Sequence, residues 1–518
     1  MSMALSIDFK GLDDSDHDNS RDHNILEGSP HEGKEELNMS HEERQTLLLH
    51  GNDHSSNSSS SNAIYSSYSS SSSRLVPKHF SPARYWKNLI VISVACMFMF
   101  SAYSALANLQ SSLHYSEGLG VASLCAIYIG VIISSLFAPL VIWVLKVKWT
   151  LVVCSVFYAI FSASNIYPAV YTLIPAAALL GLAASPFWTA IGTYITTSAI
   201  QLADVQDGIP EPIINRFNGI FFCFFQSAQV WGNLISSLVL QNTSSSDTMS
   251  QCGRSSCGTG ITFNITGNVE MAGEETLILV IIYIILGLVA TLIYIFLVDS
   301  IPKVNYKGTK TWKTHLSDHL VSTFQLMKTP YLFLLIPLMI YNGAEQAFIS
   351  ADFTKSFVSC TKGAGEVGYV MIGFGVADAL SSIIFGQLEK YSGRIVIFLF
   401  GGVVHLALLI GFELWNPEHS ATWQLVLFAV GWGIGDAVWQ TQISSLVGVI
   451  FPESQEPAFA NFRLWQAVGF AVTYALTIPS AICISHKIYG LMAFLSFSII
   501  CYIIEEYLIS RPAPPWTD

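Results

Sequence analysis

Residues 275–299 read ETLILVIIYIILGLVATLIYIFLVD, and no charged side chain interrupts the run between Glu275 and Asp299. A helix rises about 1.5 Å per residue, so a run of this length covers a hydrocarbon core about 30 Å thick. Eleven further apolar stretches of similar length lie at 88–108, 120–145, 149–168, 171–198, 216–240, 330–351, 366–387, 393–413, 422–448, 459–481 and 487–508. The sequence therefore predicts an all-α membrane protein with twelve transmembrane helices.

The composition agrees with a membrane protein and excludes several other classes. Of 518 residues, 52% are hydrophobic and only 12% are charged, whereas about a quarter of an ordinary soluble domain is charged. The net charge of -12 is concentrated in residues 1–80, which hold 13 acidic and 6 basic side chains. No basic patch, metal-ligand spacing or phosphate-binding motif is present, so we expect no nucleic-acid partner, no metal, no cofactor and no enzymatic activity.

The chain divides by composition into two membrane halves and three polar segments. Residues 1–85 are acidic and then serine-rich, with 13 serines between residues 55 and 73. Such a segment buries too little apolar surface to fold, so we predict a disordered cytosolic tail. Two six-helix halves are expected at 86–300 and 330–510, a cytosolic linker lies between them at 301–329, and a short cytosolic tail follows at 511–518.

One short pattern in the N-terminal tail has the spacing of a sorting signal. Glu43, Leu47 and Leu48 match the acidic dileucine spacing, in which two exposed leucines fill an adaptor pocket. The alternative is a transient helix, because the surrounding residues are strong helix formers. Both interpretations stay open from the sequence.

Basic residues set the orientation of the spans. With a cytosolic N-terminus, 16 Lys and Arg residues near the membrane, Arg463 among them, are assigned to the inner side. Only four, including Lys487, fall outside. The positive-inside rule therefore predicts that both termini are cytosolic.

The loop between the fifth and sixth spans supports this orientation. It carries two glycosylation sequons, at Asn242 and Asn264, and two cysteines, Cys252 and Cys257. Glycans and disulfides belong to the outer side, where a bridge between Cys252 and Cys257 is one expectation. Cys360 and Cys483 also lie near the predicted outer face, so the second expectation is that disulfides link different loops. The spacing of the cysteines alone does not decide between the two pairings.

The six-plus-six layout with cytosolic termini resembles the major facilitator fold. Residues 386–394, GQLEKYSGR, resemble part of the loop pattern of that fold, but Lys390 occupies the position of its aspartate. The corresponding loop of the first half, around Lys146, has lost the pattern. From the sequence we therefore do not expect the salt-bridge latch between the halves that this pattern forms.

Few ionisable side chains lie inside the spans, and these are functional candidates because burying a charge in lipid is costly. Glu345, Asp378, Asp436 and His405 are the deepest, whereas Asp352 and Glu413 lie near span ends, where we expect them to reach water. Two polar rows follow helical spacing, and their candidate members are Asp436 with Gln440, and Gln226 with Gln229 and Asn233. Either these residues line a cavity with coupling carboxylates, or they hydrogen-bond between helices and hold them together.

Several stretches together resemble the uncoordinated-93 family. They are YSALANLQSSL at 103–113, GLAASPFW at 181–188, FNGIFF at 217–222, WGNLISSL at 231–238 and AFANFRLW at 458–465. The resemblance extends over residues 86–508. It implies a facilitator-like fold and members known as accessory proteins, including a regulatory subunit of a two-pore potassium channel in muscle contraction and escorts of receptors to endosomes.

Three hypotheses for the function follow. The first is a non-enzymatic accessory subunit that regulates a potassium channel in the plasma membrane. The second is a proton- or cation-coupled solute transporter of the facilitator type, with an unknown small-molecule substrate. The third is a trafficking escort for membrane receptors, in endosomal or lysosomal membranes, which depends on Leu47 and Leu48.

Overall fold

The computed structural model describes residues 80–113, 119–239, 252–257, 273–301, 321–363, 365–417, 421–477 and 482–510. Most of the predicted tail at 1–85, including Glu43, Leu47 and Leu48, lies outside these residues. The sequons at Asn242 and Asn264, most of the linker at 301–329 and the segment at 511–518 also lie outside them. The assignments made for these segments stay predictions.

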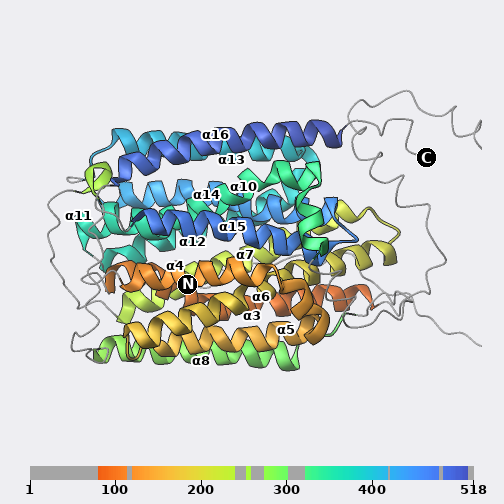
Figure 1. Cartoon of the computed structure of the whole chain (residues 1–518), viewed down its shortest axis with the longest axis horizontal. Helices are drawn as coiled ribbons and strands as arrows, with labels where there is room; N and C mark the ends of the chain where they lie inside the picture. The colour runs from red at the N-terminus through yellow and green to blue at the C-terminus, as the bar shows by residue number, and fades with distance from the viewer. Residues whose placement is uncertain are drawn as a thin grey trace, which may run out of the picture. The chain divides into compact units, whose positions relative to one another are not determined.

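Long helices make up the described part of the chain and lie side by side along one common direction (Figure 1). The first six-span half contains α3 (Pro82–Leu113), α4 (Leu119–Ser135), α5 (Ala138–Ser164), α6 (Val170–Val205), α7 (Pro210–Val239) and α8 (Glu274–Phe296). The second contains α10 (Pro330–Ala347), its π-helical continuation η3 (Phe348–Ser359), α11 (Cys360–Lys362), α12 (Gly365–Ser392), α13 (Arg394–Leu414), α14 (Thr422–Ile450), α15 (Gln455–Thr477) and α16 (Ile484–Ile509). The prediction of an all-α multi-pass membrane protein is confirmed.

Eight helical segments among the described residues are long and apolar enough to cross a membrane. The predicted spans in α7, α14 and α15 fall outside this group, and all three carry rows of buried polar side chains. The predicted span at 120–145 is broken, since α4 ends at Ser135 and α5 begins at Ala138. Helix α5 then continues through a non-helical residue, Lys146, into the third span.

The two halves repeat one backbone turn between their second and third spans. Lys146 has φ 68° and ψ 156°, and Gly393, at the matching place before α13, has φ 76° and ψ 156°. Glycine adopts this conformation freely, whereas a lysine is strained in it by its Cβ. The first half has therefore lost the glycine of the loop pattern while keeping the turn.

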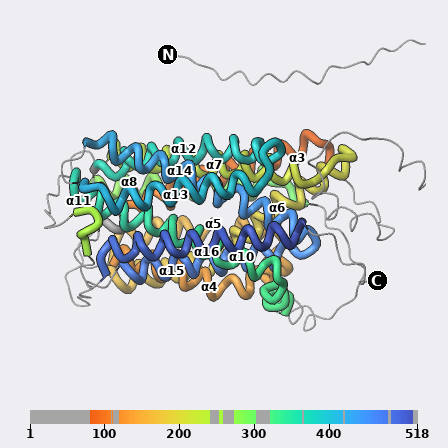
Figure 2. The backbone as a smooth tube through the Cα atoms, turned by 90° about the horizontal axis from the view of Figure 1, so that it is seen from above, coloured from red at the N-terminus to blue at the C-terminus, as the bar shows by residue number. Residues whose placement is uncertain are grey.

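Two seams join the halves, one between α7 and α12 and one between α4 and α15. Figure 2 shows α7 beside α12. At Gly219 of α7, an added Cβ would lie 2.9 Å from the Cα of Gly386 on α12, closer than real Cβ atoms approach. These glycines thus let the two helices touch backbone to backbone, as small residues do in membrane bundles.

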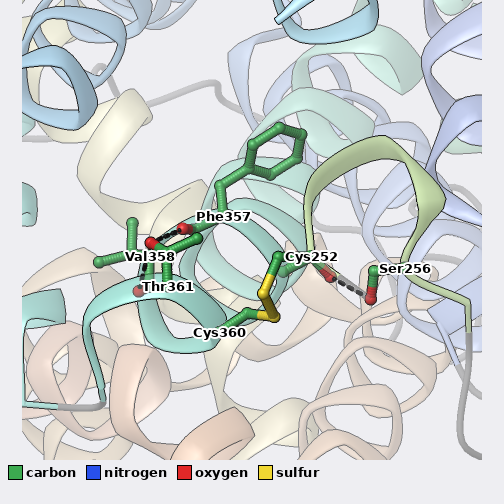
Figure 3. The surroundings of a disulfide bond; sticks show 7 residues. Cys252, Ser256, Phe357, Val358, Cys360 and Thr361 are labelled. Carbon is green, nitrogen blue, oxygen red and sulfur yellow. Dashed lines mark hydrogen bonds between the residues drawn. A yellow bond between two sulfur atoms is a disulfide. The ribbon is translucent and has the colours of Figure 1, made fainter. Parts of the chain in front are cut away.

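Two disulfides attach the loop segment 252–257 to one end of the second half. We call this end the outer end and the opposite end the inner end, after the orientation that the basic residues predict. Cys252 bonds Cys360 at the end of the α10–η3 helix (Figure 3), and Cys257 bonds Cys483 before α16. The expected bridge between Cys252 and Cys257 is therefore wrong, and the alternative, bridges between loops, is what the structure contains. We call segment 252–257 with these two bridges the outer clasp.

The clasp has further contacts that explain the pairing. The backbone N–H of Ile484 donates to the carbonyl of Ser256 at 2.9 Å. Arg254 forms an ion pair with Glu413 of α13 at 3.3 Å. These contacts lay the segment across the ends of the second-half helices, so its two cysteines meet different partners instead of each other.

Replacing Lys146 by glycine should stabilise the protein. The substitution removes the Cβ strain of an exposed turn residue, so we expect a gain of about 1 kcal/mol in the free energy of unfolding and a higher melting temperature in detergent. Gly393→Lys is the matched control. No atom lies within 4 Å of a Cβ added at Gly393, so backbone strain at its positive φ is the only expected cost, and the free energy of unfolding should fall by a similar amount. A lower melting temperature for Lys146→Gly would contradict the repeated turn.

Peptide mapping without reduction should recover Cys252 linked to Cys360 and Cys257 linked to Cys483. The bridges close loops with sequence separations of 108 and 226 residues, and in the chain-entropy model a loop of that size contributes about 4–5 kcal/mol. We therefore expect Cys257→Ser with Cys483→Ser to lower the melting temperature clearly. Cys125→Ser, a free cysteine, is the control, and a peptide that links Cys252 to Cys257 would refute the clasp.

Candidate functional site

A cavity with both apolar and polar walls lies between the two halves, next to both seams. It encloses about 130 Å³, well above the ~10–15 Å³ that one water needs. The first half contributes residues from α3, α4, α5, α6 and α7, and the second half contributes residues from α10, η3, α12, α14 and α15. Such a place, at the interface of two repeats, is where facilitator-like folds bind their ligands.

Four of the predicted site residues line this cavity: Gln226 and Gln229 on α7, and Asp436 and Gln440 on α14. Asn233 lies one turn further along α7, where its amide donates to the carbonyl of Gln229 at 2.7 Å and its Oδ1 accepts from Asn108 at 3.2 Å. Asn233 therefore links α7 to α3. This role agrees with the alternative prediction for the polar rows, in which their residues hydrogen-bond between helices.

The three deep carboxyl groups form one cluster. Asp436 on α14 lies next to both Glu345 on α10 and Asp378 on α12, and all three are at most 1% exposed. Only Asp436 also lines the cavity. Burial and mutual repulsion both disfavour the charged form of neighbouring carboxyl groups, so this carboxyl cluster favours bound protons.

Neutral donors complete the carboxyl cluster. Trp432 donates its indole N–H to Glu345 at 2.7 Å, Ser382 donates to Asp378 at 3.3 Å, and Gln226 donates its amide to Asp436 at 3.3 Å. Within the described residues none of the three carboxyl groups has an ion-pair partner. The contact between Gln226 and Asp436 crosses from the first half to the second, so it depends on the distance between the two halves.

His405 has a structural role in the same region. Its Nδ1 accepts from the indole N–H of Trp439 at 3.1 Å, and its Nε2 lies 3.2 Å from the carbonyl of Trp432. An imidazole that accepts at Nδ1 and donates at Nε2 is neutral. His405 is thus satisfied within the packed second half and is not among the residues that line the cavity.

Asp352 does not reach water as the sequence predicted. It is 1% exposed, and its carboxylate accepts from the ammonium of Lys487 at 2.6 Å. Thr477 of α15 bridges the pair, with its hydroxyl 3.3 Å from Asp352 and 3.0 Å from the ammonium. A span-end position predicts exposure, but here helices α15 and α16 cover η3, and the paired charge makes this burial tolerable.

Charged side chains join the halves at the inner end. Arg394 at the start of α13 lies 3.5 Å from Glu211 of α7 and 3.5 Å from Glu506 of α16. One turn away, Asn215 of α7 donates its amide to Glu389 of α12. A latch between the halves is therefore present on the second-half loop, contrary to the expectation from Lys390, because Arg394 and Glu389 take partners on α7.

A second charged contact at the inner end stays within the first half. Asp299, after α8, binds Arg84 at 2.8 Å and Lys87 at 3.0 Å. The hydrogen bond from Arg84, with the nearby Lys87, holds the pKa of Asp299 well below its ordinary value. The contact fixes the inner ends of α3 and α8 to each other.

The sequence missed the one basic residue of the cavity. Arg463, counted with the inner-side residues, lies two turns inside α15, is 7% exposed and lines the cavity. Its position, eight residues after the start of a helix rich in polar residues, could have predicted that Arg463 lies within the span. The predicted orientation does not depend on Arg463, since the other basic residues assigned to the inner side still form a large majority.

A search of the described residues for metal ligands finds no group of three or more His, Cys, Asp or Glu that could hold an ion. The cavity is instead lined by apolar and aromatic side chains together with amides, tyrosines, two serines, one arginine and one carboxyl group. This arrangement can bind a small polar solute or protons.

Comparison with solved structures identifies the class of the fold. The human organic anion transporter MFSD10 (TETRAN) matches with a TM-score of 0.56 at 9% sequence identity, over 82% of this chain and 99% of that structure. A mutant of the nucleoside transporter NupG matches with a TM-score of 0.50 at 15% identity, over 81% of this chain and 99% of that one. At such identities only the fold is shared, and the chain is a facilitator-type multi-pass membrane protein.

Sequence comparison identifies the family. Residues 114–503 match the family model described as "Ion channel regulatory protein UNC-93". Protein unc-93 homolog A of Bos taurus is 40% identical over 441 residues, covering 82% of this chain and 94% of the bovine protein. The Putative potassium channel regulatory protein unc-93 of Caenorhabditis elegans is 32% identical over 406 residues, covering 75% of this chain and 56% of the nematode protein. The chain belongs to the UNC-93 family.

Proposed function

We propose that this chain is a non-enzymatic accessory subunit that regulates a potassium channel in the plasma membrane. The observation that carries the proposal is the match of residues 114–503, nearly the whole membrane body, to a family described as ion channel regulatory. The name of the nematode relative supports potassium as the ion. Under this proposal the chain acts by helix packing against the channel within the bilayer.

Contacts at both ends of the bundle are consistent with a regulatory body that keeps one conformation. At the inner end Arg394 and Glu211 join the halves, and at the outer end the clasp attaches the loop of the first half to the second. A subunit that presents a constant lateral surface to a channel gains from such contacts. A two-pore potassium channel is the partner that this proposal names.

Native co-purification tests the accessory role. The chain, tagged at its own locus, should retain a potassium channel after mild detergent extraction, and depletion of the chain should change the potassium current of the same cells. An unrelated twelve-span protein with the same tag is the control. If no channel is retained even after cross-linking, and the current is unchanged on depletion, the accessory role is wrong.

A second candidate function is proton- or cation-coupled transport of a small solute. The observation that favours it is Asp436, which lines the cavity and lies next to two further buried carboxyl groups, Glu345 and Asp378. If a solute displaces Gln226 from Asp436, the cluster loses a donor that crosses between the halves. Binding of solute and of protons would then be linked, as coupled transport requires.

Purified protein in proteoliposomes tests transport. With an inward proton gradient, a dye inside the vesicles should report acidification when a transported solute from a panel of metabolites is added outside. Asp436→Asn should reduce this proton flux at least tenfold, because it removes the proton site that faces the cavity. Glu274→Gln, at an exposed position at the start of α8, should leave it unchanged. Flux that persists in Asp436→Asn contradicts the coupling role.

A further inference from the structure

Arg463 is a buried cation on the wall of the central cavity. It lies in α15, and its guanidinium carbon is 4.5 Å from the centre of the Trp188 ring on α6 and 4.4 Å from that of Phe462. The contact with Trp188 joins the two halves. Stacking on aromatic rings orients the guanidinium and stabilises its charge.

The guanidinium has too few partners for a charge at this depth. One terminal nitrogen donates to Oε1 of Gln466 at 2.6 Å, and Nε has no hydrogen-bond acceptor among the described residues. No ion pair of Arg463 with a carboxylate occurs within the same part of the chain. A buried arginine normally has a paired anion or several acceptors, because its desolvation otherwise costs several kcal/mol.

The carboxyl group on the cavity wall does not compensate Arg463. Asp436 lies next to Glu345 and Asp378 and accepts from Gln226, and no ion pair between it and Arg463 occurs among the described residues. The cavity therefore has an uncompensated positive end at Arg463. An anion that enters the cavity gains a bidentate partner there without displacing an existing salt bridge.

The remaining wall favours a flat apolar body attached to that anion. Tyr128 of α4 stacks on Phe470 of α15, with ring centres 4.0 Å apart and planes 7° apart. Phe225 and Trp188 form an edge-to-face pair with centres 4.9 Å apart, and all four rings line the cavity. Aromatic faces bind planar groups, and the volume of about 130 Å³ limits the ligand to a small molecule.

We propose that the central cavity is a binding site for a small organic anion, a monocarboxylate with a flat apolar body, whose carboxylate pairs with Arg463 and whose body lies against the aromatic wall. Nothing in this assignment depends on whether the chain regulates a channel or carries solutes. The anion would join the halves through one ligand, since Trp188 and Tyr128 belong to the first half and Arg463 and Phe470 to the second.

Equilibrium binding to the full-length chain in lipid nanodiscs tests the site. The probe is benzoate, and the readouts are quenching of tryptophan fluorescence and the shift of the melting temperature, both in gluconate buffer without chloride. We expect saturable binding of benzoate, and at least tenfold weaker binding of uncharged benzamide and of the cation benzylamine. Benzamide or benzylamine binding as tightly as benzoate would overturn the proposal, as would chloride that reproduces the whole effect.

Substitutions locate the anion at Arg463. Arg463→Gln should weaken benzoate binding at least tenfold, and Arg463→Lys should retain part of it, because the charge stays while the planar fork is lost. Arg216→Gln is the matched control, since Arg216 also stacks on a tryptophan, Trp86 at 4.8 Å, but is exposed outside the cavity. It should bind benzoate like the wild type. If Arg463→Gln does not fold, Arg463→Lys decides, and unchanged benzoate affinity in the variant that folds refutes the site.

Discussion

The contact between α7 and α12 is the interaction on which the rest of the structure depends. Gly219 and Gly386 let these helices meet backbone to backbone across the two halves. The same seam brings Asn215 of α7 to Glu389 of α12 at the inner end, and it places Gln226 of α7 against Asp436 in the middle of the bundle. A side chain at either glycine would push the helices apart and open all of these contacts.

Each buried ionisable group within the spans is stabilised by a different kind of contact. Asp352 and Lys487 neutralise each other near the outer face. The carboxyl cluster is surrounded by neutral donors, His405 is hydrogen-bonded to Trp439, Tyr341 and Trp432, and Arg463 stacks on Trp188. The Asp352–Lys487 pair and His405 are closed within the packed helices and hold them in register. Arg463 and the cavity face of Asp436 are open, and these two mark the site.

The depth of the carboxyl groups could be predicted because it depends on position within a long apolar run. Glu345, Asp378 and Asp436 are each far from their span ends, and the structure buries all three. The burial of Asp352 could not be predicted, since it needs Lys487, 135 residues away in the chain, to arrive beside it. The same holds for Cys252 and Cys257, whose partners depend on which outer helix ends lie under the clasp.

By itself the sequence determined that the chain is an all-α multi-pass membrane protein and which helices carry polar rows, because hydropathy and helical spacing are local properties of the chain. Only the tertiary structure decided which polar residues face one cavity and which tie helices together. Gln226 and Asn233 share one row of α7, yet the first meets Asp436 and the second meets Asn108. The reason is that contacts between helices depend on how closely and at what rotation they pack, and no local pattern encodes that.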